Sequence, residues 1–358
     1  MSRPRLAFSA SFSLLFAVSA VACGGGSSHS GGSSAAQESQ DSGAPPPAFV
    51  LDEGTVTLAA GQEGLFCNQM AVPAEFATPD YFVTGIDADV SLGTHHLVVL
   101  ASDDPVGSTA PLCKDTGAQP TTGGGRFQDL ALDGNLAQPV IDSLKRVAFG
   151  GGGGAAQIRF PEGYGKAMPL GFFETSHHVI NPGADPLEIH GRFGVHVAKA
   201  EDISHPMGSF FANALDVSVP AGSEGTTEGT MIAPEAMDVV ALTAHSHNFT
   251  IRFEMFPYRN GAAETNAVYL SESYESPPVT VFDPPLHLEA GEGITFRCTY
   301  RNDTAKALGW GVDGGEMCMP MGMYARPDGA SGVPPTMSVL MNGVAPAPLA
   351  PGTAGFFG

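Results

Sequence analysis

Glycine and proline interrupt this sequence at short intervals, so few long helices are expected. Of its 358 residues, 46 are Gly and 29 are Pro, and both residue types destabilise the interior of a helix. Short apolar runs lie between clusters of Gly, Pro and Asp, a pattern typical of strands joined by turns. We therefore predict an all-β chain built of two consecutive antiparallel, jelly-roll-like β-sandwiches.

The expected strands form two groups, separated by a break at 198–207. The first group comprises 55–58, 81–86, 95–100, 157–160, 171–179 and 192–197, and the second comprises 214–219, 238–242, 249–256, 267–270, 279–282, 293–299 and 336–341. We predict a first sandwich over 49–200, a second over 206–345, and a Pro-, Gly- and Ala-rich tail over 346–358.

Two further segments have their own expected structure. A short helix is expected over 141–147. The glycine run at 150–154 lacks the lysine of a phosphate-binding loop, so we expect it to be a mobile surface loop.

Composition excludes two classes of protein. Hydrophobic residues make up 43% of the chain, which rules out disorder of the whole chain. Asp and Glu (37) outnumber Lys and Arg (16), and the resulting net charge is −21. Because a negative field repels phosphate backbones, we expect no nucleic-acid partner.

The N-terminus has the features of an export signal. Arg3 and Arg5 precede an apolar run that ends in small residues, so we assign 1–22 as a signal peptide. The run ends in Ala-Val-Ala-Cys, which resembles a bacterial lipobox and predicts lipidation of Cys23; ordinary cleavage near Ala22 is the alternative. A Gly-, Ser- and Pro-rich tether follows over 23–48. We expect an exported bacterial lipoprotein of the periplasm, outer membrane or cell surface, which meets a membrane only through a lipid anchor at Cys23.

The remaining cysteines are even in number, as is typical of an oxidising compartment. They are Cys67, Cys113, Cys298 and Cys318. Proximity along the chain favours disulfides between Cys67 and Cys113 and between Cys298 and Cys318, although four cysteines allow three connectivities. A zinc site is not expected, because no pair has the Cys-x-x-Cys spacing.

Histidines gather in three places: 95–96, 177–178 and 245–247. His245 and His247 are two apart on an expected strand, so both imidazoles should point to one face and could share a metal ion. His95 and His96 are neighbours, and they reach one ion only if a β-bulge or the use of different ring nitrogens brings them together. Without a metal, one of the two would be buried and the other exposed.

Methionines follow in the segment Glu316-Met317-Cys318-Met319-Pro320-Met321-Gly322-Met323. Alternating methionines suit the core of a strand, but a thioether is also a soft ligand that selects Cu(I). A disulfide at Cys318 would fix the backbone of Met317. Imidazoles together with a thioether in an exported protein indicate copper rather than zinc.

In their order and spacing, these segments resemble the copper type II, ascorbate-dependent monooxygenases, the family of peptidylglycine hydroxylating monooxygenase and dopamine β-hydroxylase, and especially its bacterial members. The matching motifs are His95-His96-Leu97, Pro161-Glu162-Gly163-Tyr164-Gly165, the run from Glu174 to Pro182, His245-Ser246-His247, Phe282-Asp283-Pro284-Pro285, Ala290-Gly291-Glu292-Gly293, Phe296-Arg297-Cys298-Thr299-Tyr300 and Glu316-Met317-Cys318. The resemblance covers about 67–327.

The resemblance implies one copper on each sandwich. The electron-transfer copper would be held by His95, His96 and His178, where the spacing to Asn181-Pro182 favours His178 over His177. The oxygen-activating copper would be held by His245, His247 and Met317. The implied activity is hydroxylation of a C–H bond of a small or apolar organic substrate with O2, with ascorbate or another one-electron donor as co-substrate, and we expect a monomer.

Departures from the family pattern bear on the substrate. Thr243 stands where peptide-hydroxylating members have an Arg that binds the substrate carboxylate. Met319 and Met321 replace an Asn and a Tyr, Leu97 replaces a Met, and Asp238 replaces a His upstream of the ligand pair. The polar clamp for a peptide C-terminus is therefore missing, which favours a more hydrophobic substrate. The alternatives are a non-catalytic protein that stores or delivers copper, and a sandwich used only for adhesion or envelope structure.

Overall fold

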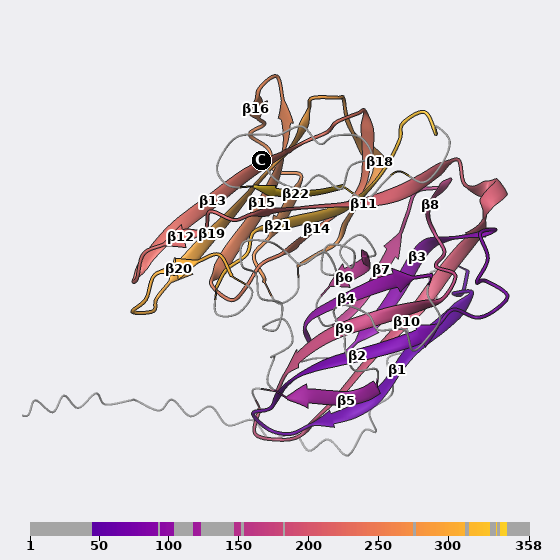
Figure 1. Ribbon diagram of the computed structural model, residues 1–358, viewed down its shortest axis with the longest axis horizontal. Coiled ribbons are helices and arrows are strands. Elements are labelled where there is room, and N and C mark those ends of the chain that lie inside the picture. Colours follow the sequence, from indigo (N-terminus) through magenta and orange to yellow (C-terminus); the bar gives the residue numbers. More distant parts are fainter. Residues whose placement is uncertain are drawn as a thin grey trace, which may run out of the picture. The chain divides into compact units, whose positions relative to one another are not determined.

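The computed structural model describes residues 45–91, 94–103, 117–122, 147–151, 154–181, 183–274, 277–311, 315–329, 334 and 337–341. Within these ranges the chain folds into strands, with one 3-10 turn, η1 (Ala200–Asp202), between them. The prediction of an all-β fold is therefore confirmed (Figure 1). The signal peptide and Cys23 lie outside the described residues, as do 141–146 of the expected helix. Its last residue, Val147, begins a strand, so the helix prediction is wrong at that residue. No helix in the described ranges has the length and apolar character needed to cross a membrane.

The strands cover both halves of the chain. Those of the first half are β1 (Phe49–Leu58), β2 (Glu63–Ala71), β3 (Tyr81–Val90), β4 (Thr94–Ser102), β5 (Gly117–Thr122), β6 (Val147–Gly151), β7 (Gly154–Arg159), β8 (Tyr164–Ala167), β9 (Phe172–Ile180) and β10 (Leu187–Lys199). Those of the second half are β11 (His205–Ala214), β12 (Ser218–Val219), β13 (Ser223–Ile232), β14 (Met237–His245), β15 (Thr250–Arg259), β16 (Ala262–Ala263), β17 (Tyr269–Ser271), β18 (Thr280–Leu288), β19 (Gly293–Asn302), β20 (Leu308–Gly309), β21 (Met319–Ala325) and β22 (Met337–Met341).

These strands pair into three large sheets and one small one. The central sheet has ten strands, in the order β1-β10-β3-β8-β11-β21-β14-β18, with β7 beside β3 and β22 beside β11. A five-stranded sheet, β5-β2-β9-β4-β6, belongs to the first half, and another, β13-β19-β15-β16 with β17, belongs to the second. Strands β12 and β20 form a separate pair. The pairing is antiparallel except where β11 runs parallel to β8 and to β22.

The first sandwich is held together by apolar side chains that alternate along facing strands. Ile86 of β3 and Phe193 of β10, from the central sheet, share a buried cluster with Leu97 of β4 and Phe173 of β9, from the five-stranded sheet. Period-two alternation directs these residues inward and leaves their neighbours for the other face.

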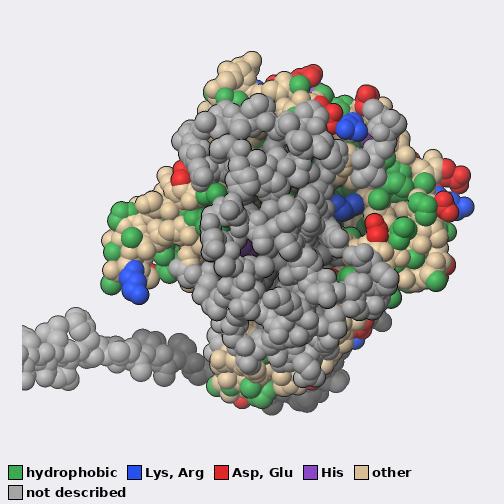
Figure 2. Space-filling model, viewed as in Figure 1, with side chains coloured by type: hydrophobic (Ala, Val, Ile, Leu, Met, Phe, Trp, Pro, Cys, Tyr) green, Lys and Arg blue, Asp and Glu red, His purple; other side chains and the backbone are tan. Residues whose placement is uncertain are grey.

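The second sandwich repeats this arrangement with the other end of the central sheet. Leu242 of β14 and Tyr324 of β21 pack in one cluster with Phe253 of β15 and Phe296 of β19. The predicted β-sandwich architecture is thus present in both halves. Figure 2 shows acidic side chains spread over the described part of one face rather than gathered in one patch.

The central sheet runs through both halves of the chain. Strand β8 pairs in parallel with β11, with Tyr164 opposite His205. Beside this pairing, Phe160 and Tyr164 pack against a buried cluster that includes Met207 and Val240. The described residues from Pro46 onward form one compact unit, and the division into domains at 49–200 and 206–345 stays a prediction.

The glycine run differs from its prediction as a surface loop. Gly150 and Gly151 end β6 and pair with Val98 and Leu97 of β4, and Gly154 begins β7 opposite Val90. The prediction is wrong for these three residues, because ladder hydrogen bonds come from backbone groups and need no side chain. Residues 152–153 lie outside the described ranges.

Candidate metal centre

His245 and His247 lie on either side of a strand end. Strand β14 ends at His245 and β15 begins at Thr250, so His247 belongs to the connecting turn. The expectation that both histidines lie on one strand is therefore wrong for His247. The two rings nevertheless lie together, with centroids 5.2 Å apart and planes at 83°. This arrangement brings the two imidazole rings to one place.

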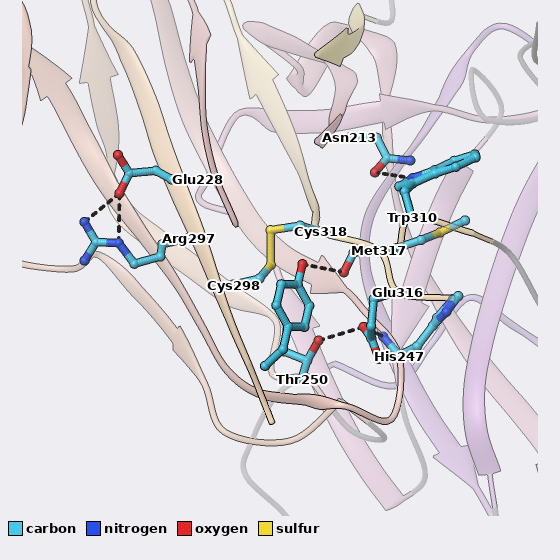
Figure 3. Close-up of a disulfide and its surroundings, with 11 residues drawn as sticks. Asn213, Glu228, His247, Thr250, Arg297, Cys298, Trp310, Glu316, Met317 and Cys318 are labelled. Atoms are coloured by element: carbon cyan, nitrogen blue, oxygen red, sulfur yellow. Dashed lines mark hydrogen bonds and ion pairs between the residues drawn. A yellow bond between two sulfur atoms is a disulfide. The ribbon is translucent and has the colours of Figure 1, made fainter. Parts of the chain in front are cut away.

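A buried carboxylate ties this turn to the methionine segment. Glu316 has no exposed surface, and its side chain accepts hydrogen bonds from the backbone amides of His247 (3.1 Å) and Phe249 (2.7 Å) and from the Thr250 hydroxyl (3.0 Å). Burial raises the pKa of Glu316, and these hydrogen bonds oppose that shift. Three contacts to one carboxylate fix the position of 315–317 relative to His247 (Figure 3).

The ring of His247 is oriented by a backbone carbonyl. Its Nδ1 lies 2.8 Å from the Gly315 oxygen. Because a carbonyl oxygen only accepts, Nδ1 carries the proton and donates it. Nε2 is then the unprotonated nitrogen of the neutral ring, which is the form that binds metals. Metal-binding histidines commonly have their second ring nitrogen fixed by such a hydrogen bond.

Met317 follows directly after Glu316. The predicted disulfide between Cys298 and Cys318 is confirmed, and it joins the residue after Met317 to β19. Figure 3 shows the side chains of Trp310, Met317 and His247 pointing to the same side, away from the disulfide. The structure thus brings the segment 315–318 against the turn that carries His247.

The central sheet adds a further methionine beside His245. In the pairing of β14 with β21, His245 lies opposite Met319 and Thr243 lies opposite Met321. The intervening residues of both strands, such as Leu242 and Tyr324, face the sandwich core. Alternation therefore places His245, Met319 and Met321 on the other face of the central sheet.

Ligand type limits what this centre can bind. Within the described residues, no three side chains of His, Cys, Asp or Glu come together as a metal site. A third protein ligand for a metal held by His245 and His247 would therefore be a donor of another kind. The Met317 thioether is such a donor, and Met317 follows Gly315 and Glu316, which contact His247. Sulfur from methionine with two imidazoles suits copper, because thioethers select Cu(I).

The backbone also brings the first predicted ligand set together. Strands β4 and β9 pair with His96 opposite His178, and the register shifts between Thr94 and His96. Two residues of β4 therefore face one of β9, an irregularity of the kind that was one of the two ways expected to bring His95 and His96 to one ion. The side chains of His95, His96 and His178 lie outside the described part of the structure.

His177 has a structural role. Its fully buried ring contacts Glu53 Oε2 through Nδ1 (2.9 Å) and the Thr94 hydroxyl through Nε2 (2.7 Å). Thr94 gives its own hydrogen to the Ser91 carbonyl (2.8 Å), so the imidazole is the donor to Thr94. With both ring nitrogens engaged, His177 is not available to a metal, and His178 remains the candidate of the pair.

Several residues around the centre were missed from the sequence. Glu316 was noted only as part of a motif, and Trp310 was not considered. A carboxylate inside an otherwise apolar segment and the chain's single tryptophan were the available signals.

The second predicted disulfide joins Cys67 to Cys113. Cys113 lies outside the described residues, so this disulfide stays a prediction.

Comparisons with known proteins add little to this picture. No family model and no curated protein matches the sequence. Among solved structures, the chain is similar to the major capsid protein P2 of bacteriophage PM2, at 11% identity and a TM-score of 0.29, over 78% of this chain and 97% of that one. It is also similar to the infectious bursal disease virus VP2 subviral particle, at 10% identity and a TM-score of 0.20, over 80% of this chain and 75% of that one. Scores this low carry no conclusion about function.

Proposed function

We propose that this protein is a copper-dependent monooxygenase that hydroxylates a C–H bond of a small or apolar organic substrate with O2, using ascorbate or another one-electron donor. The observation that carries the proposal is the hydrogen bond from His247 Nδ1 to the Gly315 carbonyl. It leaves Nε2 as the metal-binding nitrogen and joins the histidine turn to the segment that carries Met317.

The residues fit copper. His245, His247 and Met317 would hold one ion, and His95, His96 and His178 would hold a second. Copper at these positions would supply one-electron chemistry and the activation of O2. Neutral imidazoles suit Cu(II) and the thioether suits Cu(I), so the site formed by His245, His247 and Met317 tolerates both oxidation states.

Neighbouring residues fix the position of His247 and surround the methionines of this site with apolar side chains. Glu316 and Gly315 fix the turn and the tautomer of His247. Phe211 and Trp310 pack against Met317 and Met319 and give this face of the central sheet an apolar surface. Such a surface would receive an apolar substrate.

The same apolar surface is the reason to propose an apolar substrate rather than a peptide carboxylate. Thr243, Met319 and Met321 occupy neighbouring positions of β14 and β21 beside His245. None of the three carries a positive charge that could pair with a carboxylate. The net charge of −21 would also oppose the approach of an anion.

A second candidate function is copper storage or delivery without hydroxylation. The additional methionines beside His245 favour it, because soft ligands beyond those needed for catalysis suit a carrier of Cu(I). With either function we propose an exported lipoprotein anchored at Cys23, acting as a monomer. The net charge and the spread of acidic side chains in Figure 2 support the absence of a nucleic-acid partner.

The deciding experiment is metal analysis of the exported protein combined with an assay for hydroxylated product. We expect two coppers per chain, the loss of one in His247→Ala, and weaker Cu(I) binding at one site in Met317→Ile. His287→Ala, at a half-exposed position on β18, is the matched control and should keep both. Ascorbate-dependent O2 uptake coupled to product supports the oxygenase. Copper loading without product from any tested apolar substrate supports the carrier, and a single shared copper would overturn the assignment.

A further inference from the structure

Three methionines form a cluster at the edge of the candidate centre. Met317, Met319 and Met321, here called the thioether cluster, pack with Phe211 and Trp310. The oxygenase proposal uses only Met317 as a ligand. Met319 and Met321 therefore have no assigned role beyond a contribution to the apolar surface.

Strand register places two members of the cluster directly beside His245 and its neighbours. Met319 lies opposite His245 on β14, and Met321 lies between Thr243 of β14 and Phe211 of β11. Directly opposite residues of antiparallel strands have Cβ atoms about 4.5–5.5 Å apart. The thioether of Met319 is therefore within side-chain reach of the His245 ring.

The thioether cluster reaches the surface through one of its members. Met317 and Met319 are buried, with 8% and 7% of their surface exposed, as much as Met70 in the core of the first sandwich (8%). Met321 is more open again, at an intermediate level of burial. A dissolved ion would therefore reach the cluster from the side of Met321.

Trp310 is fixed against the cluster. Its Nε1 donates to the Asn213 side chain (3.2 Å), and its backbone forms a bridge to Glu316. Figure 3 shows its indole on the same side as the Met317 side chain. The face of an indole attracts cations, so the tryptophan adds to the affinity of the cluster for a cation.

We propose that the thioether cluster is an entry site for Cu(I), which it captures and passes to His245 and His247. Uncharged sulfur ligands favour a soft monovalent ion over Zn²⁺ or Cu²⁺. Transfer is a ligand exchange: bonds from copper to the sulfurs of Met319 and Met321 break, and bonds to imidazole nitrogens form. Met317 stays bound throughout, and the oxidation state does not change. Only the transfer step rests on the proposed function; capture does not.

Ag(I), added as its nitrate, is the probe for capture, and the fluorescence of the single tryptophan is the readout. We expect Ag(I) to quench Trp310 in the full chain and in the His245→Ala/His247→Ala variant. The quench should be lost in Met319→Leu/Met321→Leu, which preserves side-chain volume. Met323→Leu is the matched control, because Met323 lies on the same strand but packs in a different cluster, with Met207 and Val240, and it should quench as the full chain does.

A second measurement uses the unaltered protein. With methionine methyl groups labelled with carbon-13, Ag(I) should shift the resonances of Met317, Met319 and Met321 and leave those of Met207 and Met255 in place. The proposal is overturned if the quench survives in Met319→Leu/Met321→Leu and disappears in the double histidine variant. An absence of hydroxylated product would count against the oxygenase while leaving Ag(I) capture standing, so the two failures are distinguishable.

Discussion

Glu316 and His247 are linked through the backbone: the amide of His247 donates to Glu316 Oε2 at 3.1 Å. The backbone carbonyl of Gly315, the residue before Glu316, accepts a hydrogen bond from the ring of His247. One short segment therefore sets both the backbone position and the ring orientation of His247. Any role of His247 as a ligand depends on this contact.

Replacing Glu316 with Ala should weaken both the fold and the metal site. Two amides and a hydroxyl would lose a buried charged acceptor, which costs about 1–3 kcal/mol of unfolding free energy. Copper affinity at His247 should fall by about 10–100-fold, with the other copper unchanged. Urea unfolding and copper titration measure the two effects.

The matched control for this variant is Glu228→Ala. Glu228 pairs with Arg297 on the same sandwich (Figure 3), but both side chains are about two-fifths exposed. We expect the unfolding free energy to change by less than about 1 kcal/mol and the copper affinity to stay the same. Equal losses in the two variants would contradict the assigned role of Glu316.

The disulfide should contribute through the loop it closes. Cys298 and Cys318 are 20 residues apart, and the loss of such a cross-link costs about 3 kcal/mol. Cys298→Ala/Cys318→Ala should lower the urea midpoint accordingly and also weaken copper at Met317, because the adjacent backbone is released. If the double variant unfolds at the midpoint of the unaltered protein, the cross-link has no such role.

Substitutions of His177 and His178 should have different effects, one on stability and the other on metal binding. In His177→Gln the buried Glu53 carboxylate loses a partner, so the unfolding free energy should fall by about 1–3 kcal/mol while copper content stays unchanged. His178→Gln should show the reverse, with one copper lost and little change in stability. Copper counting together with urea unfolding checks both variants, and a loss of copper in His177→Gln alone would reverse the assignment.

Lys166 should make stability depend on alkaline pH. Burial lowers the pKa of Lys166 to about 8 from 10.5. Between these values the unfolded chain binds more protons than the folded one, so the free energy of unfolding should rise with pH across this window. Lys166→Met should remove that slope and raise stability at neutral pH. Urea unfolding between the two pH limits measures this slope, and Lys199→Met, at an exposed position, is the control. If the slope of unfolding free energy against pH is unchanged in Lys166→Met, Lys166 does not cause it.

Much of the fold could be predicted because turn residues and period-two alternation are local signals. The sequence could not predict that both halves share one sheet. The parallel pairing of β8 with β11 rests on backbone hydrogen bonds, which leave no signal in the composition. The strand over Gly150 and Gly151 was missed for the same reason.

The candidate site shows a similar limit. The pairing of Met319 with His245 depends on register, which the methionine spacing alone does not determine. His177 could not be assigned to the interior, because its partner Glu53 lies 124 residues earlier in the chain. The position of His247 in a turn depends on where β14 ends, and the sequence specifies the ends of strands only weakly.

The parallel pairing of β8 with β11 has a consequence for how the chain can be divided. A fragment that stops after Asp202 would leave one side of β8 without its neighbour, and a fragment that begins there would leave the same gap beside β11. Open strand edges recruit other chains, so each half produced alone should aggregate, and the protein should reach its soluble form only after both halves have been made and joined.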